Sequence, residues 1–340
     1  MFAARQGRHG ARTAVTALLI FLLAACTGPE EGPPGATSAA LSDGPPWSSG
    51  VWLGGVTKAS EVEAFGRWRG AEVDTFTMYP AYETWREIIE SEWHVATLKG
   101  FPGRLTYGLP LLPAGEEGSL RDVGRGAHDN VWRAVAEVLV KHHREDSYVR
   151  IGLEANGTWF PWGATAATAG DFRAAFRRVA GVLRSVAPQL QLVFDISCGA
   201  ALTGAVSDRL ASLTRLYPGD DVVDVVGCDH YDSWSAIARN EAQWADTIAP
   251  DTGPGLSDVV AFAREHNKQF AVPEWGLTAA DVHGGGDNPF LVRKMFAFFV
   301  TNRDVLAFEN YFDHENPVLG SSLFVSAQNP RSAAVYRALW

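Results

Sequence analysis

Eight apolar segments, each followed by a stretch of helical periodicity, constrain the fold of this chain more than any other feature. They are rich in Val, Ile, Phe and Tyr, and their apolar residues are continuous instead of alternating with polar ones. The segments are 51–56, 73–79, 104–112, 148–154, 191–196, 222–229, 269–274 and 305–312. Continuous apolar strands are typical of a parallel sheet that is covered by helices.

Large apolar residues recur at helical spacing between these segments. The stripes are Trp132, Val135 and Leu139; Phe172, Phe176, Val179 and Leu183; and Leu291, Met295 and Phe298. Core packing explains them without a cofactor. A doubly wound open sheet is the competing architecture, but it usually opens on a longer glycine-rich turn than Leu53-Gly54-Gly55. Eight strand–helix units predict an α/β fold, a (β/α)8 TIM barrel over residues 49–340.

The N-terminal residues differ in composition from the rest of the chain. Three arginines precede an apolar stretch at 14–25 that is too short to span a membrane. It ends in Leu23-Ala24-Ala25-Cys26, the pattern at which bacterial lipoprotein signal peptides are lipidated and cleaved. We therefore predict a signal peptide over 1–25, lipidation of Cys26, and localisation at the outer face of the bacterial cell membrane. An uncleaved anchor that ends in a chance cysteine is the alternative.

Residues 26–48 are rich in Gly, Pro, Ser and Ala, so we expect a flexible tether between the lipid and the barrel. The lipid is the only membrane contact that the sequence predicts. The chain carries 29 Lys and Arg residues against 39 Asp and Glu residues, a net charge of −10. Such acidity disfavours nucleic acid and anionic lipid as partners, but not a neutral polysaccharide. We expect a monomer.

Two cysteines remain once Cys26 is assigned to the lipid. Cys198 and Cys228 lie at or just beyond the ends of predicted strands. In an exported protein they can form a disulfide, and two buried free thiols are the alternative. No residue spacing matches a zinc motif or a phosphate-binding loop, so we expect neither a metal nor a cofactor.

Two carboxylates stand at the ends of apolar segments. Glu154 follows the fourth segment and Glu274 ends the seventh. The C-terminal strand ends of a (β/α)8 barrel meet at one mouth, where active sites lie, so we expect both carboxylates there. Two carboxylates that flank a bond are what glycoside hydrolysis needs. Other predicted strand ends contribute Tyr79, Tyr107, Asp195, Asp229, Tyr231 and Asn310.

Aromatic residues near the two carboxylates suit a sugar ligand, because aromatic rings pack against the C–H faces of sugars. The chain has 12 tryptophans. We predict substrate contact for Trp159, Trp162 and Trp275. Trp234 is a fourth tryptophan near the predicted cleft. The alternative is that a tryptophan is simply a large core residue, as we expect for Trp132.

Polar residues of the same segments complete the predicted site. Arg150 has the strand parity of Glu154 and is expected to face inward, where it either favours a carboxylate or braces the barrel as an ion pair. Asn156 can donate to a substrate hydroxyl. The glycine-rich loop at 283–287 is either a mobile rim over the cleft or a plain connector.

At these residues the chain resembles the clan-A glycoside hydrolases, which keep an acid/base after strand four and a nucleophile after strand seven. Within the clan it most resembles family 26, the β-mannanase family. Glu154-Ala-Asn-Gly-Thr-Trp159 matches that family's Glu-x-Asn-Gly-x-Trp pattern, and the segments 223–232 and 273–276 continue the likeness. Leu153 stands where family 26 mannanases commonly carry histidine. Because of this difference, the resemblance does not decide which β-glycan is cleaved.

The resemblance implies a retaining, endo-acting hydrolase of β-linked polysaccharide, either β-mannan or a related β-glycan. It implies Glu274 as nucleophile and Glu154 as acid/base, with their carboxyl groups ~5–5.5 Å apart. It also implies that Tyr231 donates a hydrogen bond to Glu274 and that Asp229 and Tyr231 lie in the substrate cleft. A non-catalytic glycan-binding envelope lipoprotein is the alternative, and a purely structural envelope lipoprotein is a third possibility.

Overall fold

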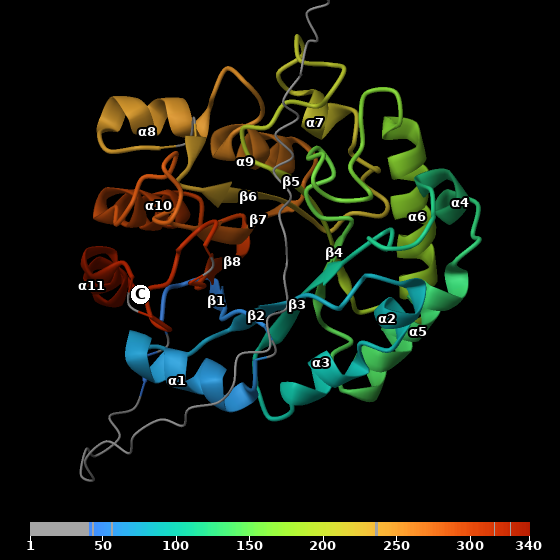
Figure 1. Cartoon of the computed structure of the whole chain (residues 1–340), viewed down its shortest axis with the longest axis horizontal. Helices are drawn as coiled ribbons and strands as arrows, with labels where there is room; N and C mark the ends of the chain where they lie inside the picture. The colour runs from blue at the N-terminus through green and yellow to red at the C-terminus, as the bar shows by residue number, and fades with distance from the viewer. Residues whose placement is uncertain (1–40, 43, 56, 235–236, 316, 327) are drawn as a thin grey trace, which may run out of the picture.

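Eight parallel strands form a closed barrel, with helices around its outside (Figure 1). The computed structural model describes residues 41–340 except 43, 56, 235–236, 316 and 327. The strands are β1 (Ser48–Trp52), β2 (Thr75–Met78), β3 (Arg104–Leu109), β4 (Tyr148–Ile151), β5 (Gln191–Ser197), β6 (Val225–Tyr231), β7 (Gln269–Gly276) and β8 (Leu306–Phe312). Each pairs with its neighbours in the chain, and β8 pairs with β1. The predicted (β/α)8 barrel is confirmed.

The helices between and after the strands bury their apolar stripes against the sheet. They are α1 (Ala59–Arg69), α2 (Trp85–Ile89), α3 (Glu92–Thr97), α4 (Leu120–Gly124), α5 (Asp129–Lys141), α6 (Ala169–Val186), α7 (Ala211–Thr214), α8 (Glu241–Ile248), α9 (Leu256–Glu265), α10 (Pro289–Thr301) and α11 (Pro330–Leu339). On α5 the predicted stripe of Trp132, Val135 and Leu139 is buried. On α10 the buried face includes the predicted Leu291 and Met295, but it ends with Phe299 in place of the predicted Phe298.

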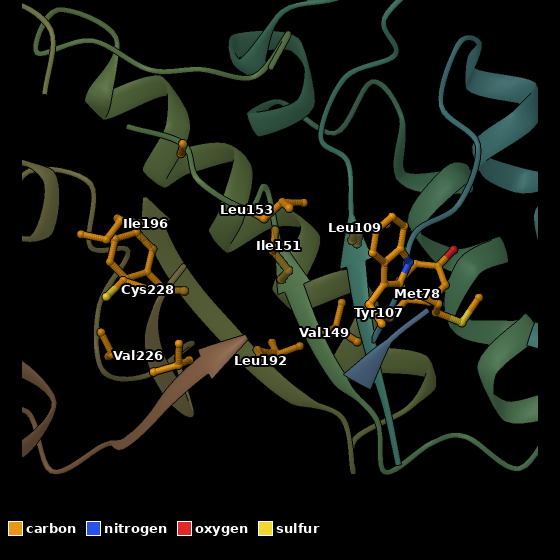
Figure 2. Packing of buried hydrophobic residues seen from close by; sticks show 14 of the residues in the cluster. Met78, Tyr107, Leu109, Val149, Ile151, Leu153, Leu192, Ile196, Val226 and Cys228 are labelled. Carbon is orange, nitrogen blue, oxygen red and sulfur yellow. The ribbon is translucent and has the colours of Figure 1, made fainter. Parts of the chain in front are cut away.

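The apolar core has two parts. The larger part lies between the barrel and its helices, and Figure 2 shows Leu109, Val149, Leu192 and Val226 on the neighbouring strands β3 to β6. The smaller cluster comprises Tyr148, Val193, Val225, Ala271, Ala307 and Phe308. These residues lie near the starts of their strands, so they fill the N-terminal half of the barrel. The polar side chains of the C-terminal half therefore face its mouth.

The strands β4 and β7, which carry Glu154 and Glu274 in the prediction, end at other residues than predicted. β4 ends at Ile151, so Glu154 stands in the turn beyond the strand, and both Gly152 and Glu154 have positive φ (61° and 50°). This left-handed backbone turns the chain sharply out of the sheet. β7 continues to Gly276, so Glu274 lies inside a strand. Glu274 therefore lies within a strand, whereas Glu154 lies in a turn.

The tether predicted over 26–48 is wrong at its C-terminal end. The backbone N–H of Ser42 donates to Gly70 and its carbonyl accepts from Glu72, each at 3.2 Å. Trp47 is only 6% exposed, because its ring packs among the aromatic side chains of α10. Cys26, the signal peptide and the rest of the tether lie outside the described residues. Within the described ranges, no helix is both long and apolar enough to cross a bilayer.

A disulfide joins Cys198, just beyond the end of β5, to Cys228 in the middle of β6. Cys198 and Cys228 are bonded through their Sγ atoms, with Cα atoms 5.3 Å apart and a sequence separation of 30. Of the two alternatives for these cysteines, the structure therefore has the disulfide. It connects two strands that both contribute side chains to the barrel mouth.

Replacing both cysteines by alanine should lower the free energy of unfolding by about 3–4 kcal/mol, because the crosslink restricts a loop of this length in the unfolded chain. Urea unfolding of the variant and of the oxidised parent protein measures the difference. Labelling of the denatured, unreduced parent with a thiol reagent is the control. Two reactive thiols at positions 198 and 228 would contradict the disulfide.

Candidate active site

A buried guanidinium organises the mouth of the barrel. The side chain of Arg150, on β4, is fully buried. Its Nη2 donates to Asp195 Oδ2 at 2.7 Å and to Asp229, and its Nη1 donates to Glu274 Oε1 at 2.6 Å. Carboxylates from β5, β6 and β7 thus converge on one cation. Both predicted alternatives for Arg150 hold, because it pairs with Glu274 and also braces the barrel.

Glu274 accepts hydrogen bonds from three side chains. Besides Arg150, the hydroxyl of Tyr79 donates to Oε1 at 2.5 Å and that of Tyr231 donates to Oε2 at 2.7 Å. The expected bond from Tyr231 is therefore present. A carboxylate only accepts hydrogen bonds, so the ionised form of Glu274 satisfies all three donors. The side chain keeps 11% of its surface exposed at the mouth.

The two tyrosines remain donors over the whole physiological range. Burial, and then the charge of Glu274, raises the pKa of both Tyr79 and Tyr231 well above the usual value. Tyr79 and Asp195 were not predicted as site residues. Each nevertheless stands at the end of a predicted apolar segment, and this position in the sequence could have identified them as site residues.

Glu154 lies at the same barrel mouth as Glu274, but in a different environment. Burial, and then the charge of Glu274, raises the pKa of Glu154 to about 8. The indole Nε1 of Trp159 donates to Glu154 Oε2 at 2.8 Å, and this bond opposes the rise in pKa. At neutral pH Glu154 therefore carries a proton that it can donate. Two carboxylates whose environments differ in this way are how sites assign one acid and one base or nucleophile.

The loop that carries Glu154 is held by Asn156. Its side-chain amide donates to the carbonyls of Ser197 at 2.9 Å and Ala200 at 3.1 Å, and its Oδ1 accepts from the backbone N–H of Ser197 at 2.8 Å. The amide is therefore committed to the end of β5, and its prediction as a substrate contact is wrong.

The three tryptophans predicted to contact substrate have different surroundings. Trp159 is 38% exposed beside Glu154. A Cβ atom at Gly157 would lie 2.3 Å from the Trp159 ring, so this position requires glycine. Trp162 is 1% exposed, donates to the carbonyl of Leu153 at 2.8 Å and stacks on Phe160. No free face of Trp162 remains for a sugar, and its predicted substrate contact is wrong.

Trp275 is also a packing residue. It is fully buried, and its indole donates to Glu309 Oε2 at 2.5 Å. Successive residues of a strand point to opposite sides. Because Glu274 faces the barrel interior, Trp275 faces the surrounding helices, and its predicted substrate contact is wrong.

Asp229 borders both the Arg150 network and a cavity. Burial raises the pKa of Asp229 well above its usual value; the charge of Arg150 opposes this rise, and that of Glu274 adds to it. Asp229 and Tyr231 line a cavity of about 260 Å³, and their substrate contacts stay predictions. Within the described residues, no group of three or more His, Cys, Asp or Glu side chains is arranged to hold a metal ion.

Comparison with known proteins gives this geometry a family context. A mannan endo-1,4-beta-mannosidase from Bifidobacterium adolescentis is 36% identical over 194 residues, which is 55% of this chain and 18% of that protein. Endoglucanase H from Acetivibrio thermocellus is 24% identical over 204 residues, 57% of this chain and 21% of that protein. The chain thus spans about a fifth of the length of these curated relatives.

Solved structures share the fold. A modular endo-beta-1,4-mannanase from Cellulomonas fimi superposes with a TM-score of 0.63 at 18% identity, over 86% of this chain and 70% of that one. Residues 133–263, which include Arg150, Glu154 and Asp229, match the model of glycosyl hydrolase family 26. Together with the curated mannosidase relative, this match shows that the central part of the chain is similar to glycosyl hydrolase family 26.

Proposed function

We propose that this chain is a retaining, endo-acting glycoside hydrolase that cleaves β-linked polysaccharide. One observation carries the proposal: two carboxylates share the barrel mouth, Glu274 with three donors on its oxygens and Glu154 with its pKa raised to about 8. One is equipped to attack as an anion and the other to donate a proton, and retaining hydrolysis needs this pair.

In the first step, a Glu274 oxygen attacks the anomeric carbon and forms a glycosyl-enzyme ester. The glycosidic bond breaks, and its electron pair leaves with the departing oxygen, which takes the proton of Glu154. Arg150, Tyr79 and Tyr231 hold the attacking carboxylate in one orientation, so little reorganisation precedes the attack.

In the second step, Glu154 has lost its proton and acts as a base. It takes a proton from water, whose oxygen attacks the anomeric carbon and releases Glu274 as a carboxylate. Two inversions give net retention, and Glu154 regains its proton. The bond from the Trp159 indole favours the ionised form of Glu154 that this step needs.

The relatives suggest β-1,4-mannan as the first substrate to test, since the more similar one is a mannan endo-1,4-beta-mannosidase. The other is an endoglucanase, so β-glucans belong in the same panel. Reducing-sugar release from mannan, glucomannan, mixed-linkage glucan and xylan tests the proposal. Binding to one of these polymers without any release would instead support the non-catalytic glycan-binding alternative.

Glu274→Ala should lower kcat/KM at least about a thousandfold, a loss of about 4 kcal/mol of transition-state stabilisation, because the nucleophile is gone. Asp195 and Asp229 still pair with Arg150, so we expect the variant to fold. Azide should restore turnover of an activated aryl glycoside and give a glycosyl azide of inverted configuration. Glu265→Ala, on the exposed face of α9, is the matched control. Near-parental activity of Glu274→Ala would remove this residue from the mechanism.

The alkaline limb of the pH profile should report Glu154. Because the protonated form donates to the leaving oxygen, kcat/KM should fall as pH rises through about 8. In Trp159→Phe the pKa of Glu154 loses a bond that lowers it, so the limb should move to higher pH. In Glu154→Gln, assayed on an activated aryl glycoside, the limb should vanish. A limb that persists unchanged in Glu154→Gln would assign the proton donor to another group.

We also propose that the chain is exported and anchored by lipid on Cys26, which the Leu23-Ala24-Ala25-Cys26 pattern supports. Bacterial lipoproteins carry two or three acyl chains, which anchor stably where a single chain does not. Cys26→Ser should therefore move the protein from the membrane fraction to the soluble fraction, with unchanged specific activity. Recovery of the unaltered chain mainly as unlipidated, soluble protein would contradict the anchor.

A further inference from the structure

One strand of the barrel carries an extra residue beside the proposed nucleophile. Ala271 and Trp275 are four residues apart on β7, but their partners on β6 are only three apart. Val272 and Trp275 are three apart, and their partners on β8 are only two apart. Against both neighbours, β7 therefore has one additional residue in the stretch that contains Pro273 and Glu274. Such an insertion is a β-bulge, which re-aims a side chain and is common next to active sites.

The bulge decides which way Glu274 points. Phe270 and Val272 belong to the part of the core that lies between the barrel and its helices, so their side chains face outward. Regular alternation would place Glu274 on the same outward side. With the extra residue, Glu274 instead faces the mouth and Arg150, and Trp275 takes the outward position. Because a slip of one residue turns every later side chain to the other face, the direction of Glu274 depends on the bulge.

Pro273 explains why the bulge forms at this place. Proline has no backbone N–H, so within sheets it occurs at edges, at strand starts or at bulges. β7 is paired on both sides, and Pro273 lies in the middle of the strand. The ring fixes only the φ angle of proline itself. The direction of the residues that follow therefore depends on what their side chains contact.

A buried carboxylate holds the outward side of the bulge. Glu309 is 0% exposed and lies on β8 opposite Val272, where the bulge begins. Its Oε2 accepts from the indole of Trp275 at 2.5 Å, and its Oε1 accepts from the indole of Trp340 at 2.8 Å. Burial raises the pKa of Glu309, and hydrogen bonds from Ser49 and the two indoles oppose this rise. Glu309 is thus bonded on both oxygens, yet it has no part in the proposed reaction.

The bond from Trp275 to Glu309 gives the indole a fixed direction. A hydrogen bond weakens steeply when it is bent, whereas apolar contact is non-directional. The ring of Tyr311, the β8 partner of Trp275, packs edge-on against the same indole at 4.8 Å. Trp275 is the residue next to Glu274 in the chain. A fixed indole on the outer side of β7 therefore restrains the backbone that aims Glu274 at the mouth.

We propose that Glu309 is a positioning residue for Glu274, because its bond to the Trp275 indole holds the bulge that turns the nucleophile into the barrel mouth. This inference rests on the proposed glycoside hydrolase function. It deepens that function by naming a residue that acts on the reaction from outside the barrel, without touching the substrate. A carboxylate that only stabilises the layer between β8 and the helices is the alternative that the test must separate.

Trp275→Phe and Trp340→Phe form a matched pair. Each removes one indole N–H from the same buried carboxylate and keeps an aromatic ring, but only Trp275 adjoins the bulge. The measurement is the rate at which a 2-deoxy-2-fluoroglycosyl fluoride of the preferred sugar forms an ester with Glu274, followed by intact mass. Fluoride leaves without needing a proton from Glu154, so this rate reports the nucleophile alone.

The two variants should differ in this rate. A reacting group that is misplaced by about 1 Å can slow a reaction about a hundredfold, so we expect a fall of at least about tenfold in Trp275→Phe. In Trp340→Phe the rate should stay at the parental value. Melting temperatures of both variants show what each lost bond contributes to stability.

Glu309→Leu removes the acceptor without changing β7, and it should slow ester formation as Trp275→Phe does. Both changes remove the same bond, so the double variant should react no more slowly than the slower single variant. If Glu309→Leu does not fold, the matched tryptophan pair decides alone.

A parental rate in Trp275→Phe would overturn the positioning role and leave Glu309 as a stabilising residue, with the proposed function intact. Equal losses of rate in Trp275→Phe and Trp340→Phe would also overturn it, because nearness to the bulge would then not matter. A parent protein that neither cleaves any β-glycan nor becomes labelled on Glu274 would end the proposed function, and the positioning role with it.

Discussion

The buried guanidinium of Arg150 is the interaction on which the site depends. Moving charges out of water is expensive unless they are paired and hydrogen-bonded, so Asp195, Asp229 and Glu274 are stable in the barrel only around this cation. Burial alone would lower the pKa of Arg150, but the three carboxylates raise it well above the usual value. The ends of four consecutive strands are thereby held together, and Glu274 is fixed in position before any substrate arrives.

The same network accounts for the difference between Glu154 and Glu274. The charges of Glu274 and Asp195 raise the pKa of Glu154, and the charge of Arg150 opposes this rise. Glu274 has Arg150 and two tyrosines as donors, whereas Glu154 has the indole of Trp159. Two residues of the same chemical type thus acquire opposite tasks through their neighbours alone. The left-handed turn at Gly152 and Glu154 contributes by placing Glu154 beyond the end of β4.

Much of this arrangement could be predicted from the sequence, because strand ends in a closed barrel converge whatever their distance along the chain. Glu154, Glu274 and Tyr231 were located in this way. The errors at Trp162, Asn156 and Trp275 share one cause, since nearness in sequence to a functional residue says nothing about direction. For Trp275 the parity rule that placed Arg150 was sufficient. For Trp162 and Asn156 it was not, because both lie in a turn with no fixed period, where only the folded backbone decides which side chain is buried.

Hydrogen-bond saturation separates the structural carboxylates from those at the mouth. Glu309 accepts from the indoles of Trp275 and Trp340, and both oxygens of Asp313 accept bonds from the 322–325 segment. These buried groups have little capacity left for a ligand. Asp195 and Asp229 are equally buried, yet each has one oxygen without a hydrogen-bond partner among the described residues. The other oxygen of each is bonded to Arg150, which also donates to Glu274, so these two carboxylates hold the guanidinium that orients the proposed nucleophile.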